Sequence, residues 1–409
     1  MITLVNDFVR NAQCNFLLLL LCINCGVLHS QKSVDLFCFG HSLIDHRPPA
    51  IPTPSDETTI IHWIHDIAAF KGYTFKAGGQ YGFLTSHDNL PPFSQWGYDN
   101  VPGAWDSDVE DFSETEINTI LITPANFIQY QSPLLPHPLD ESTTVTEATK
   151  NIFEWVKMQK PDAKLFIYAN WPEMDLANAF PPNIPSDSEI TSYHDWTANS
   201  FMDWWIEYQD AMLEINPNWN TRMIPVGAVI SQIITDVIPG EIPFDELYED
   251  SAPHGRASLY FLAGMITYMA IYEERLPENY IPDAIVHEGI INNLTEINTF
   301  AWNALNNFNF SSDQSRVFCS EITNVSENIS ENKKRLRIYP IPNDGNFTIT
   351  KTLDINNFDL IDIHGNVLDN ITQNETRFDY DFNQLSDGVY FIRYQLDGQL
   401  YFEKIILVK

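Results

Sequence analysis

From Val34 to about residue 308, short continuous apolar runs alternate with longer stretches in which apolar residues recur at helical spacing. The short runs are typical of buried strands, and the longer stretches predict helices that pack on them. The predicted strands are 34–39, 73–76, 119–123, 164–168 and 223–225. The predicted helices are 59–71, 147–159, 192–214, 259–274 and 290–305. This alternation predicts a three-layer α/β domain, residues 32–308, with a mainly parallel sheet.

The pattern changes in the last hundred residues of the chain. Residues 309–335 are rich in Ser, Asn, Asp and Glu and have few apolar positions, which predicts a linker. Residues 336–409 alternate apolar and polar positions in short runs, separated by turn sequences such as Asn343-Asp344-Gly345 and Ser386-Asp387-Gly388. We therefore expect a small antiparallel β-sandwich at the C-terminus.

The first 31 residues predict a signal peptide. Arg10 precedes an apolar run over residues 16–28, and Ser30-Gln31 offers a cleavage point. This run is too short for a membrane anchor, and no later stretch reaches the roughly 20 apolar residues that a spanning helix needs. We expect an exported, soluble protein with no transmembrane segment.

Charge and cysteine content narrow the classes of partner. The chain has 22 Lys+Arg against 55 Asp+Glu, a formal net charge of −33, which repels phosphate backbones and anionic membrane surfaces. Nucleic acid is therefore excluded as an expected partner. Beyond the signal peptide only Cys38 and Cys319 remain. An oxidising exterior permits a disulfide between them, and a buried free Cys38 is an equally ordinary outcome.

Ser42 follows the first predicted strand, in the sequence Gly40-His41-Ser42. Parallel α/β folds place their reacting groups at the carboxyl ends of strands, where a rigid backbone presents side chains from the adjoining loop. A serine at this position also serves as a helix N-cap. Which of these two roles Ser42 has therefore depends on the residues that follow the other predicted strands at the same edge of the sheet.

Further polar and glycine residues follow the other predicted strands. Gly79 and Gly82 come after the second strand, and glycine lets a backbone N–H approach a substrate oxygen closely. Asn126 follows the third strand. Asp250 and His254 stand directly before the apolar helix 259–274. An imidazole can take the proton of a serine hydroxyl, and a carboxylate can orient that imidazole.

The order Ser, Gly, Asn, His over residues 33–308 resembles the SGNH (GDSL-type) hydrolase family. The resemblance implies a flavodoxin-like domain in which Ser42 is the nucleophile and His254 the general base. It also implies an oxyanion hole formed by the backbone N–H groups of Ser42 and Gly82 and by the Asn126 side chain, with Gly79 as the alternative to Gly82. Such an esterase needs no metal and no cofactor.

Two positions depart from the family pattern. His41 stands where the family has Asp, and Ser251 stands three residues before the histidine, where the family has its acid. Asp250 is our preferred triad acid, since a loop can absorb one residue. Glu249 and a Ser-His dyad remain open, as does an inactive relative that binds glycans without cleaving them.

Three more residues are expected to contact substrate: Trp171, in the segment after the fourth strand, Gly79 and His41. The alternative for Trp171 is a buried anchor for its loop. Trp96 and Trp105 lie in an aromatic and acidic loop that can line a sugar-binding cleft. His62 and His65 have no third ligand at a zinc-like spacing, so we expect no metal site.

Near the C-terminus, Ile338-Tyr339-Pro340-Ile341-Pro342-Asn343-Asp344-Gly345, Leu385-Ser386-Asp387-Gly388-Val389-Tyr390 and a basic last strand ending at Lys409 resemble the C-terminal sorting domain of the Bacteroidetes type IX secretion system. The resemblance implies passage across the outer membrane by that machinery, followed by release or attachment to the cell surface. A carbohydrate-binding sandwich is the alternative. Together the two resemblances predict an extracellular serine esterase, plausibly a carbohydrate O-deacylase that acts on a small-molecule or carbohydrate ester.

Overall fold

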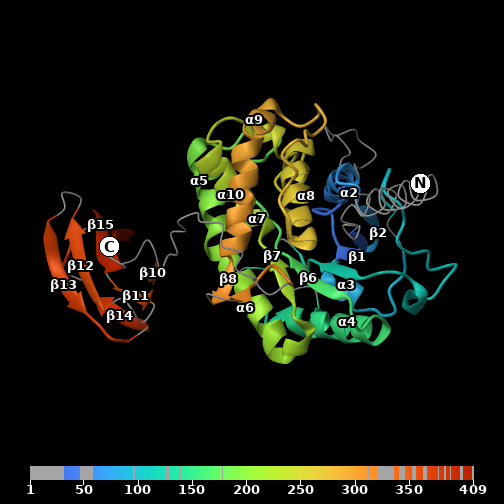
Figure 1. The fold of residues 1–409 in the computed structure, drawn as a ribbon, viewed down its shortest axis with the longest axis horizontal. Helices are drawn as coiled ribbons and strands as arrows, with labels where there is room; N and C mark the ends of the chain where they lie inside the picture. Colours follow the sequence, from blue (N-terminus) through green and yellow to red (C-terminus); the bar gives the residue numbers. More distant parts are fainter. Residues whose placement is uncertain are drawn as a thin grey trace, which may run out of the picture. The chain divides into compact units, whose positions relative to one another are not determined.

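The computed structural model describes residues 32–46, 59–94, 97–125, 129, 131–137, 140–176, 178–311, 314–319, 336–339, 346–351, 356–362, 366–375, 377–381, 384–386, 388–396 and 399–407. The predicted signal peptide lies outside these residues. The chain divides into two compact units, Met1–Thr323 and Asn324–Lys409. Figure 1 shows the helices and strands of both units.

The first unit is built on a five-stranded sheet in which all neighbouring strands are parallel. Its strands are β1 (Ser33–Gly40), β2 (Thr74–Tyr81), β3 (Thr119–Ile122), β6 (Lys164–Tyr168) and β7 (Arg222–Ile224). Their order is β2-β1-β3-β6-β7, the order of the flavodoxin-like doubly wound fold. The predicted fold class is confirmed.

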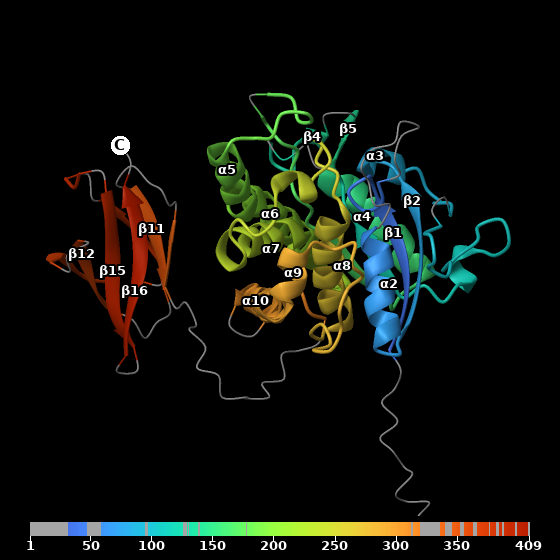
Figure 2. The same cartoon turned by 90° about the horizontal axis from the view of Figure 1, so that it is seen from above.

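Helices cover both faces of this sheet (Figure 2). They are α2 (Ile60–Phe70), α3 (Leu84–His87), α4 (Val145–Gln159), α5 (Asp187–Ala198), α6 (Ser200–Ile215), α7 (Val226–Gln232), α8 (Ala257–Tyr272), α9 (Glu288–Asn292) and α10 (Leu294–Asn307). Two short two-stranded sheets pair β4 (Pro136–His137) with β5 (Asp140–Thr144) and β8 (Asn309–Ser311) with β9 (Gln314–Ser315).

Successive residues of β1 pack into two separate hydrophobic cores, because side chains along a strand alternate between its two faces. Leu36 and Cys38 pack with α2 and α8, whereas Phe37 and Phe39 pack with α4 and α6. Burial on both faces explains why the strands are continuous apolar runs. β1 is thereby held firmly in the centre of the domain.

α8 is the most deeply buried helix of the first unit. All of its residues are buried, in agreement with a sequence that is apolar on every face. It packs against α2 at Gly264, where an added Cβ would lie 2.6 Å from Cβ of Trp63. Glycine at this point permits the two helices to approach closely.

The predicted helix 192–214 is two helices in the structure. α5 ends at Ala198 and α6 begins at Ser200, and Asn199 between them has a ψ of −94°. The Asn199 side chain donates a hydrogen bond to the Asp195 carbonyl at 2.8 Å, which satisfies one of the last acceptors of α5. Asparagine competes with helical backbone hydrogen bonds in this way. The aromatic residues on both sides had hidden this break in the apolar pattern.

The first unit extends past residue 308, so the prediction that a linker begins at residue 309 is wrong. β8 and β9 pair with one another, and Val317 and Phe318 are buried in the core shared with α8 and α10. The carbonyl of Arg316 accepts a hydrogen bond of 2.9 Å from the backbone N–H of Met223 in β7. The residues after Cys319 and before Leu336 lie outside the described part.

The second unit is a β-sandwich of two antiparallel sheets, as predicted. One sheet consists of β10 (Leu336–Tyr339), β11 (Asn346–Lys351) and β14 (Arg377–Asp381). The other consists of β12 (Asn357–Asp362), β13 (Val367–Thr372), β15 (Gly388–Leu396) and β16 (Gln399–Leu407). Buried residues from both sheets form a single core. Across the described residues of the whole chain, every helix is too short or too polar to span a membrane.

Candidate active site

Ser42 lies in the turn that follows β1. The backbone N–H of Ile44 donates to the carbonyl of His41 at 2.9 Å, which closes this turn. Gly40 precedes it, and an added Cβ there would lie 2.9 Å from both Sγ of Cys38 and Cγ1 of Ile44. Glycine is therefore needed where the strand enters the turn. The Ser42 side chain is left half-buried, next to two buried apolar residues.

His254 lies in a closed loop between residues 247 and 256. The Glu249 N–H donates to the His254 carbonyl at 2.8 Å, and the Arg256 N–H donates to the Leu247 carbonyl at 2.9 Å. The indole Nε1 of the buried Trp171 donates to the Pro253 carbonyl at 2.9 Å. The loop that carries His254 is thus fixed to the segment after β6 and leads directly into α8.

The structure brings Ser42, His254 and Asp250 together. Nε2 of His254 lies 2.8 Å from Oγ of Ser42, and Nδ1 lies 2.7 Å from Oδ2 of Asp250. The other carboxylate oxygen of Asp250 accepts hydrogen bonds of 3.0 Å from the backbone N–H groups of Ala252 and His254. Both distances are within hydrogen-bond reach, which is what a serine nucleophile, a histidine base and an acid that orients the base require.

The electrostatics of Asp250 favour its charged form. Burial raises the pKa of this carboxyl, but the hydrogen bond and charge interaction with His254 and the two backbone donors outweigh burial and lower the pKa below its usual value. A charged acceptor at Nδ1 assigns the ring proton of neutral His254 to that nitrogen. Nε2 is then free to accept the proton of Ser42.

Glu249, the alternative acid, takes a different partner. Its Oε2 lies 3.2 Å from Nε2 of His46, and its side chain is only 1% exposed. The ring of His46 in turn stacks on the ring of His254, with centroids 3.6 Å apart and an angle of 14° between the planes. Sequence reasoning did not identify His46. The available signal was a second histidine four residues after the candidate serine.

The two glycines expected at the oxyanion hole both lie where β1 pairs with β2. The Gly82 N–H donates to the Gly40 carbonyl at 2.9 Å, which continues the pairing of β1 with β2. Gly79 lies inside β2, buried, opposite Cys38. Strand pairing therefore uses the Gly82 N–H, the group that the resemblance had suggested for an oxyanion. The Ser42 N–H, by contrast, makes no hydrogen bond to any residue that the structure describes.

His41 and Trp171, expected to contact substrate, are each 1% exposed and present almost no surface to one. Burial is the main cause that lowers the pKa of His41 to about 3, so its ring is neutral at ordinary pH. Trp171 acts instead as the anchor of the His254 loop. The adjacent Asn170 is also buried, and its Oδ1 accepts a hydrogen bond of 2.6 Å from the Thr123 hydroxyl after β3.

Asn126 and Trp96 fall outside the described residues, so the expectations for them stay predictions. Trp105 packs edge to face on Phe37 and Phe112, with ring centroids 5.4 Å and 5.1 Å away. It is partly buried and packs against the core that includes Phe37 and Phe112.

The remaining candidate groups have structural partners. Within the described residues, His, Cys, Asp and Glu side chains form no cluster suited to a metal ion. Asp66, which follows His65, accepts a hydrogen bond of 2.6 Å from the Tyr280 hydroxyl. Cys38 and Cys319 are both free thiols. Burial raises the pKa of Cys38 far above its ordinary value, so this thiol is unreactive.

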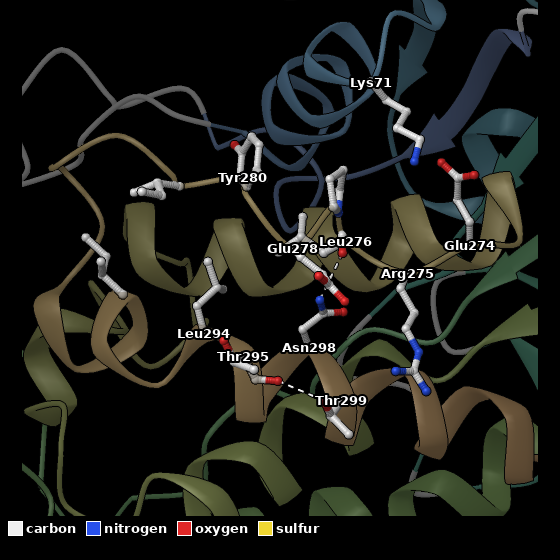
Figure 3. A pocket seen from close by; sticks show the side chains of 13 residues that line it. Lys71, Glu274, Arg275, Leu276, Glu278, Tyr280, Leu294, Thr295, Asn298 and Thr299 are labelled. Atoms are coloured by element: carbon white, nitrogen blue, oxygen red, sulfur yellow. Dashed lines mark hydrogen bonds between the residues drawn. The ribbon is translucent and has the colours of Figure 1, made fainter. Parts of the chain in front are cut away.

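A cavity of about 710 Å³ lies elsewhere on the first unit (Figure 3). Lys71, Glu274, Arg275 and Tyr280 are among its lining residues, at the end of α2 and just beyond the end of α8. The loop that carries His254 precedes the opposite end of α8, and a helix of 16 residues is about 24 Å long. This cavity is therefore separate from Ser42 and His254.

Comparison with known proteins identifies the C-terminal part. Residues 337–409 match the model of the secretion system C-terminal sorting domain. This domain indicates that the protein is secreted or displayed on the cell surface, as in Bacteroidetes. No curated protein matches the chain in sequence.

Two solved structures are similar to the chain at low identity. A mutant of an acetyl-xylooligosaccharide esterase from Geobacillus has 12% sequence identity and a TM-score of 0.33, and the match covers 59% of this chain and 94% of that one. A protein from Lactobacillus plantarum has 10% identity and a TM-score of 0.28, with coverage of 60% and 99%.

Proposed function

We propose that the first unit is a secreted serine hydrolase that cleaves ester bonds, with Ser42 as nucleophile, His254 as general base and Asp250 as the acid that orients it. The observation that carries the proposal is the continuous chain of contacts from Asp250 through His254 to Ser42, of 2.7 Å and 2.8 Å. A serine hydroxyl is a weak nucleophile until a base takes its proton, and this arrangement supplies the base at hydrogen-bond distance.

In the acylation step, Oγ of Ser42 attacks the carbonyl carbon of the ester while its proton passes to Nε2 of His254. The carbonyl electron pair moves onto oxygen, which gives a tetrahedral oxyanion. The negative charge of Asp250 stabilises the imidazolium that forms. Collapse of the intermediate expels the alcohol, which takes the proton from Nε2 and leaves the acyl group on Ser42.

In the deacylation step, His254 takes a proton from a water molecule, whose oxygen attacks the acyl carbon. A second oxyanion forms and collapses, Oγ of Ser42 regains its proton from Nε2, and the carboxylic acid leaves. The enzyme returns to its starting protonation state. The chemistry uses neither a metal nor a cofactor.

The oxyanion needs hydrogen-bond donors aimed at it. The backbone N–H of Ser42 is a suitable donor, since this N–H donates no hydrogen bond to any other described residue. We propose the Asn126 side chain as the second donor, on the strength of its position after β3. Loss of one such donor typically lowers kcat by about 100- to 1000-fold in other hydrolases.

We propose acylated, uncharged carbohydrates as the substrate class. Tyr81 is the last residue of β2 and pairs in register with Gly40, the residue that precedes the serine turn. Its side chain is 44% exposed, so an aromatic surface is available there. Aromatic side chains supply flat apolar surface in small-molecule sites. The net charge of −33 disfavours anionic substrates.

Ester hydrolysis by the purified exported protein tests the proposal. The panel is acetylated neutral sugars, an acetylated acidic sugar, a short activated aryl ester and a long-chain ester. Ser42→Ala is expected to abolish turnover of every ester, whereas Ser251→Ala, in the same site but outside the proposed machinery, is expected to retain it. Equal rates for wild type and Ser42→Ala would remove Ser42 from the mechanism, and binding of glycans without any turnover would favour a non-catalytic glycan-binding protein.

A further inference from the structure

A second histidine and carboxylate stand behind the candidate base. The ring of His46 lies flat against the ring of His254, with centroids 3.6 Å apart and planes 14° from parallel. Nε2 of His46 lies 3.2 Å from Oε2 of Glu249. The two side chains are 11% and 1% exposed, so the pair is a buried feature.

This pair joins the two segments that carry the proposed nucleophile and base. His46 follows Ser42 by four residues, and Leu43 and Ile44 between them are fully buried. Glu249 precedes Asp250, and its backbone N–H donates to the His254 carbonyl. The contact from His46 to Glu249 therefore ties the turn after β1 to the loop before α8.

His46 is the polar partner of the buried Glu249 carboxylate. Neither of its oxygens makes a hydrogen bond within the described part of the chain, and His46 is the basic side chain found within 4 Å there. A buried carboxylate without a partner is costly. The 3.2 Å contact does not meet hydrogen-bond geometry, so it is a close polar contact and not a directed bond.

The hydrogen bonds of His254 leave one motion unrestrained. Its contacts to Ser42 and Asp250 both lie at ring nitrogens and hold the two ends of the imidazole. The ring can still rotate about the line that joins these two nitrogens. The two hydrogen bonds oppose this rotation only weakly, because neither of them contacts a face of the ring. The stacked ring of His46 covers one face and resists this rotation directly.

We propose that His46, held in place by Glu249, is a positioning residue that fixes the plane of the His254 ring so that Nε2 stays aimed at Oγ of Ser42. This inference rests on the proposed function of Ser42 and His254. It assigns the buried Glu249 a role that the reaction itself does not need. His46 acts through His254 and does not touch the reacting atoms.

Two substitutions of His46 separate ring stacking from simple filling of space. Leucine fills the volume without a flat face, whereas phenylalanine retains an aromatic face. In the full exported chain, His46→Leu is expected to lower kcat by about 10- to 100-fold with KM nearly unchanged, the order of loss that follows misplacement of a catalytic group. His46→Phe is expected to recover most of that loss. Glu249→Ala is expected to resemble His46→Leu.

A matched control is His62→Leu. His62 has the same intermediate exposure, and its ring contact is with Trp63 on α2. The same replacement there is expected to leave kcat at the wild-type value. If His46→Leu, His46→Phe and His62→Leu have equal kcat, or if leucine and phenylalanine at position 46 lower kcat equally, the positioning role is overturned.

A spectroscopic readout separates failure of this inference from failure of the proposed function. The proton on Nδ1 of His254, hydrogen-bonded to Asp250, gives a downfield proton NMR signal whether or not the protein turns over an ester. The signal is expected to be sharp in wild type and His46→Phe, and broadened in His46→Leu. Lack of esterase activity with this pattern preserved would remove the proposed function alone. An unchanged signal in all three proteins would overturn the positioning role.

Discussion

Asp250 accepts two hydrogen bonds from His254, one from its ring Nδ1 at 2.7 Å and one from its backbone N–H at 3.0 Å. Five residues of loop, from 250 to 254, therefore close on themselves through one carboxylate. In the family that the sequence resembles, the acid stands three residues before the histidine. An acid four residues before it reaches the same ring nitrogen, because the loop turns back over Ala252.

The first prediction concerns the identity of the acid. Asp250→Asn keeps the size of the side chain but removes its charge and favours the wrong ring tautomer of His254, so kcat is expected to fall by about 10⁴-fold, as in serine proteases. Glu249→Gln retains the shape of the His46 partner and is expected to cost far less. Steady-state kinetics on one acetylated sugar decides between them. The reverse order of effects would make Glu249 the acid.

The second prediction concerns pH. His254 must be neutral to accept the proton of Ser42, so kcat/KM is expected to fall as the pH is lowered through the mildly acidic range and the imidazole becomes protonated. The pKa of Asp250 is lowered below its ordinary value, so this carboxylate stays charged throughout that range. Rates measured from pH 5 to pH 8 with an uncharged substrate test this. A profile that is flat over these values would contradict the role of His254.

The third prediction concerns Trp171. Trp171→Phe removes the 2.9 Å hydrogen bond to the Pro253 carbonyl and leaves that buried acceptor unpaired, at a cost of about 1–3 kcal/mol. Looser support of the His254 loop is expected to lower kcat with little effect on KM. Trp205→Phe, at an equally buried tryptophan in the opposite core, is the control. An increase in KM alone would restore Trp171 as a substrate contact.

The fourth prediction concerns stability in acid. Burial lowers the pKa of His194 to about 4, below the value of about 6.5 in the unfolded chain. Below pH 6.5 the unfolded state binds a proton that the folded state does not, so the stability due to neutral His194 is lost as pH falls from about 6.5 toward 4. The contribution to the slope is about 1.4 kcal/mol per pH unit.

His194→Gln removes this titration and retains a side chain able to bond the Ser231 hydroxyl, which lies 3.0 Å from Nδ1. Urea unfolding of both proteins at several values between pH 5 and pH 7.5 measures the difference. The free energy of unfolding is expected to fall less steeply with acidity in the variant. Parallel curves would show that His194 is already protonated in the folded state.

The sequence predicted the sheet and the two ends of the proposed proton path. Buried strands such as β1 and β3 are apolar on both faces, and that composition is visible without a structure. Because the carboxyl ends of parallel strands share one edge, Ser42 was expected there. The placement of His254 followed from its position immediately before the most apolar helix.

The depth of individual side chains was less predictable. His41 and Ser42 are consecutive in the turn after β1, yet the first is buried and the second is half-exposed. Sequence spacing does not distinguish these directions outside a regular strand. The same limit applies to Trp171, whose place beneath the His254 loop depends on a contact with a residue 82 positions away. Stacking of His46 on His254 likewise arises from the meeting of two distant loops.

The extent of the first unit was missed for a different reason. Residues 309–319 are polar in composition, but a few apolar anchors such as Val317 suffice to seat them. A backbone hydrogen bond from Met223 of β7 to the Arg316 carbonyl adds to them, and such a bond leaves no trace in side-chain composition. Linker predictions based on polarity are therefore weakest beside the edge of a sheet.

The full burial of α8 ties the proposed base to the most protected part of the molecule. Ala257 begins the helix three residues after His254, and every residue to Tyr272 is shielded from solvent. The base cannot drift far from Ser42 unless the helix leaves its place beside α2 on the sheet. Heat or denaturant should then extinguish turnover and collapse the fold in a single event, with no long-lived folded but inactive form between them.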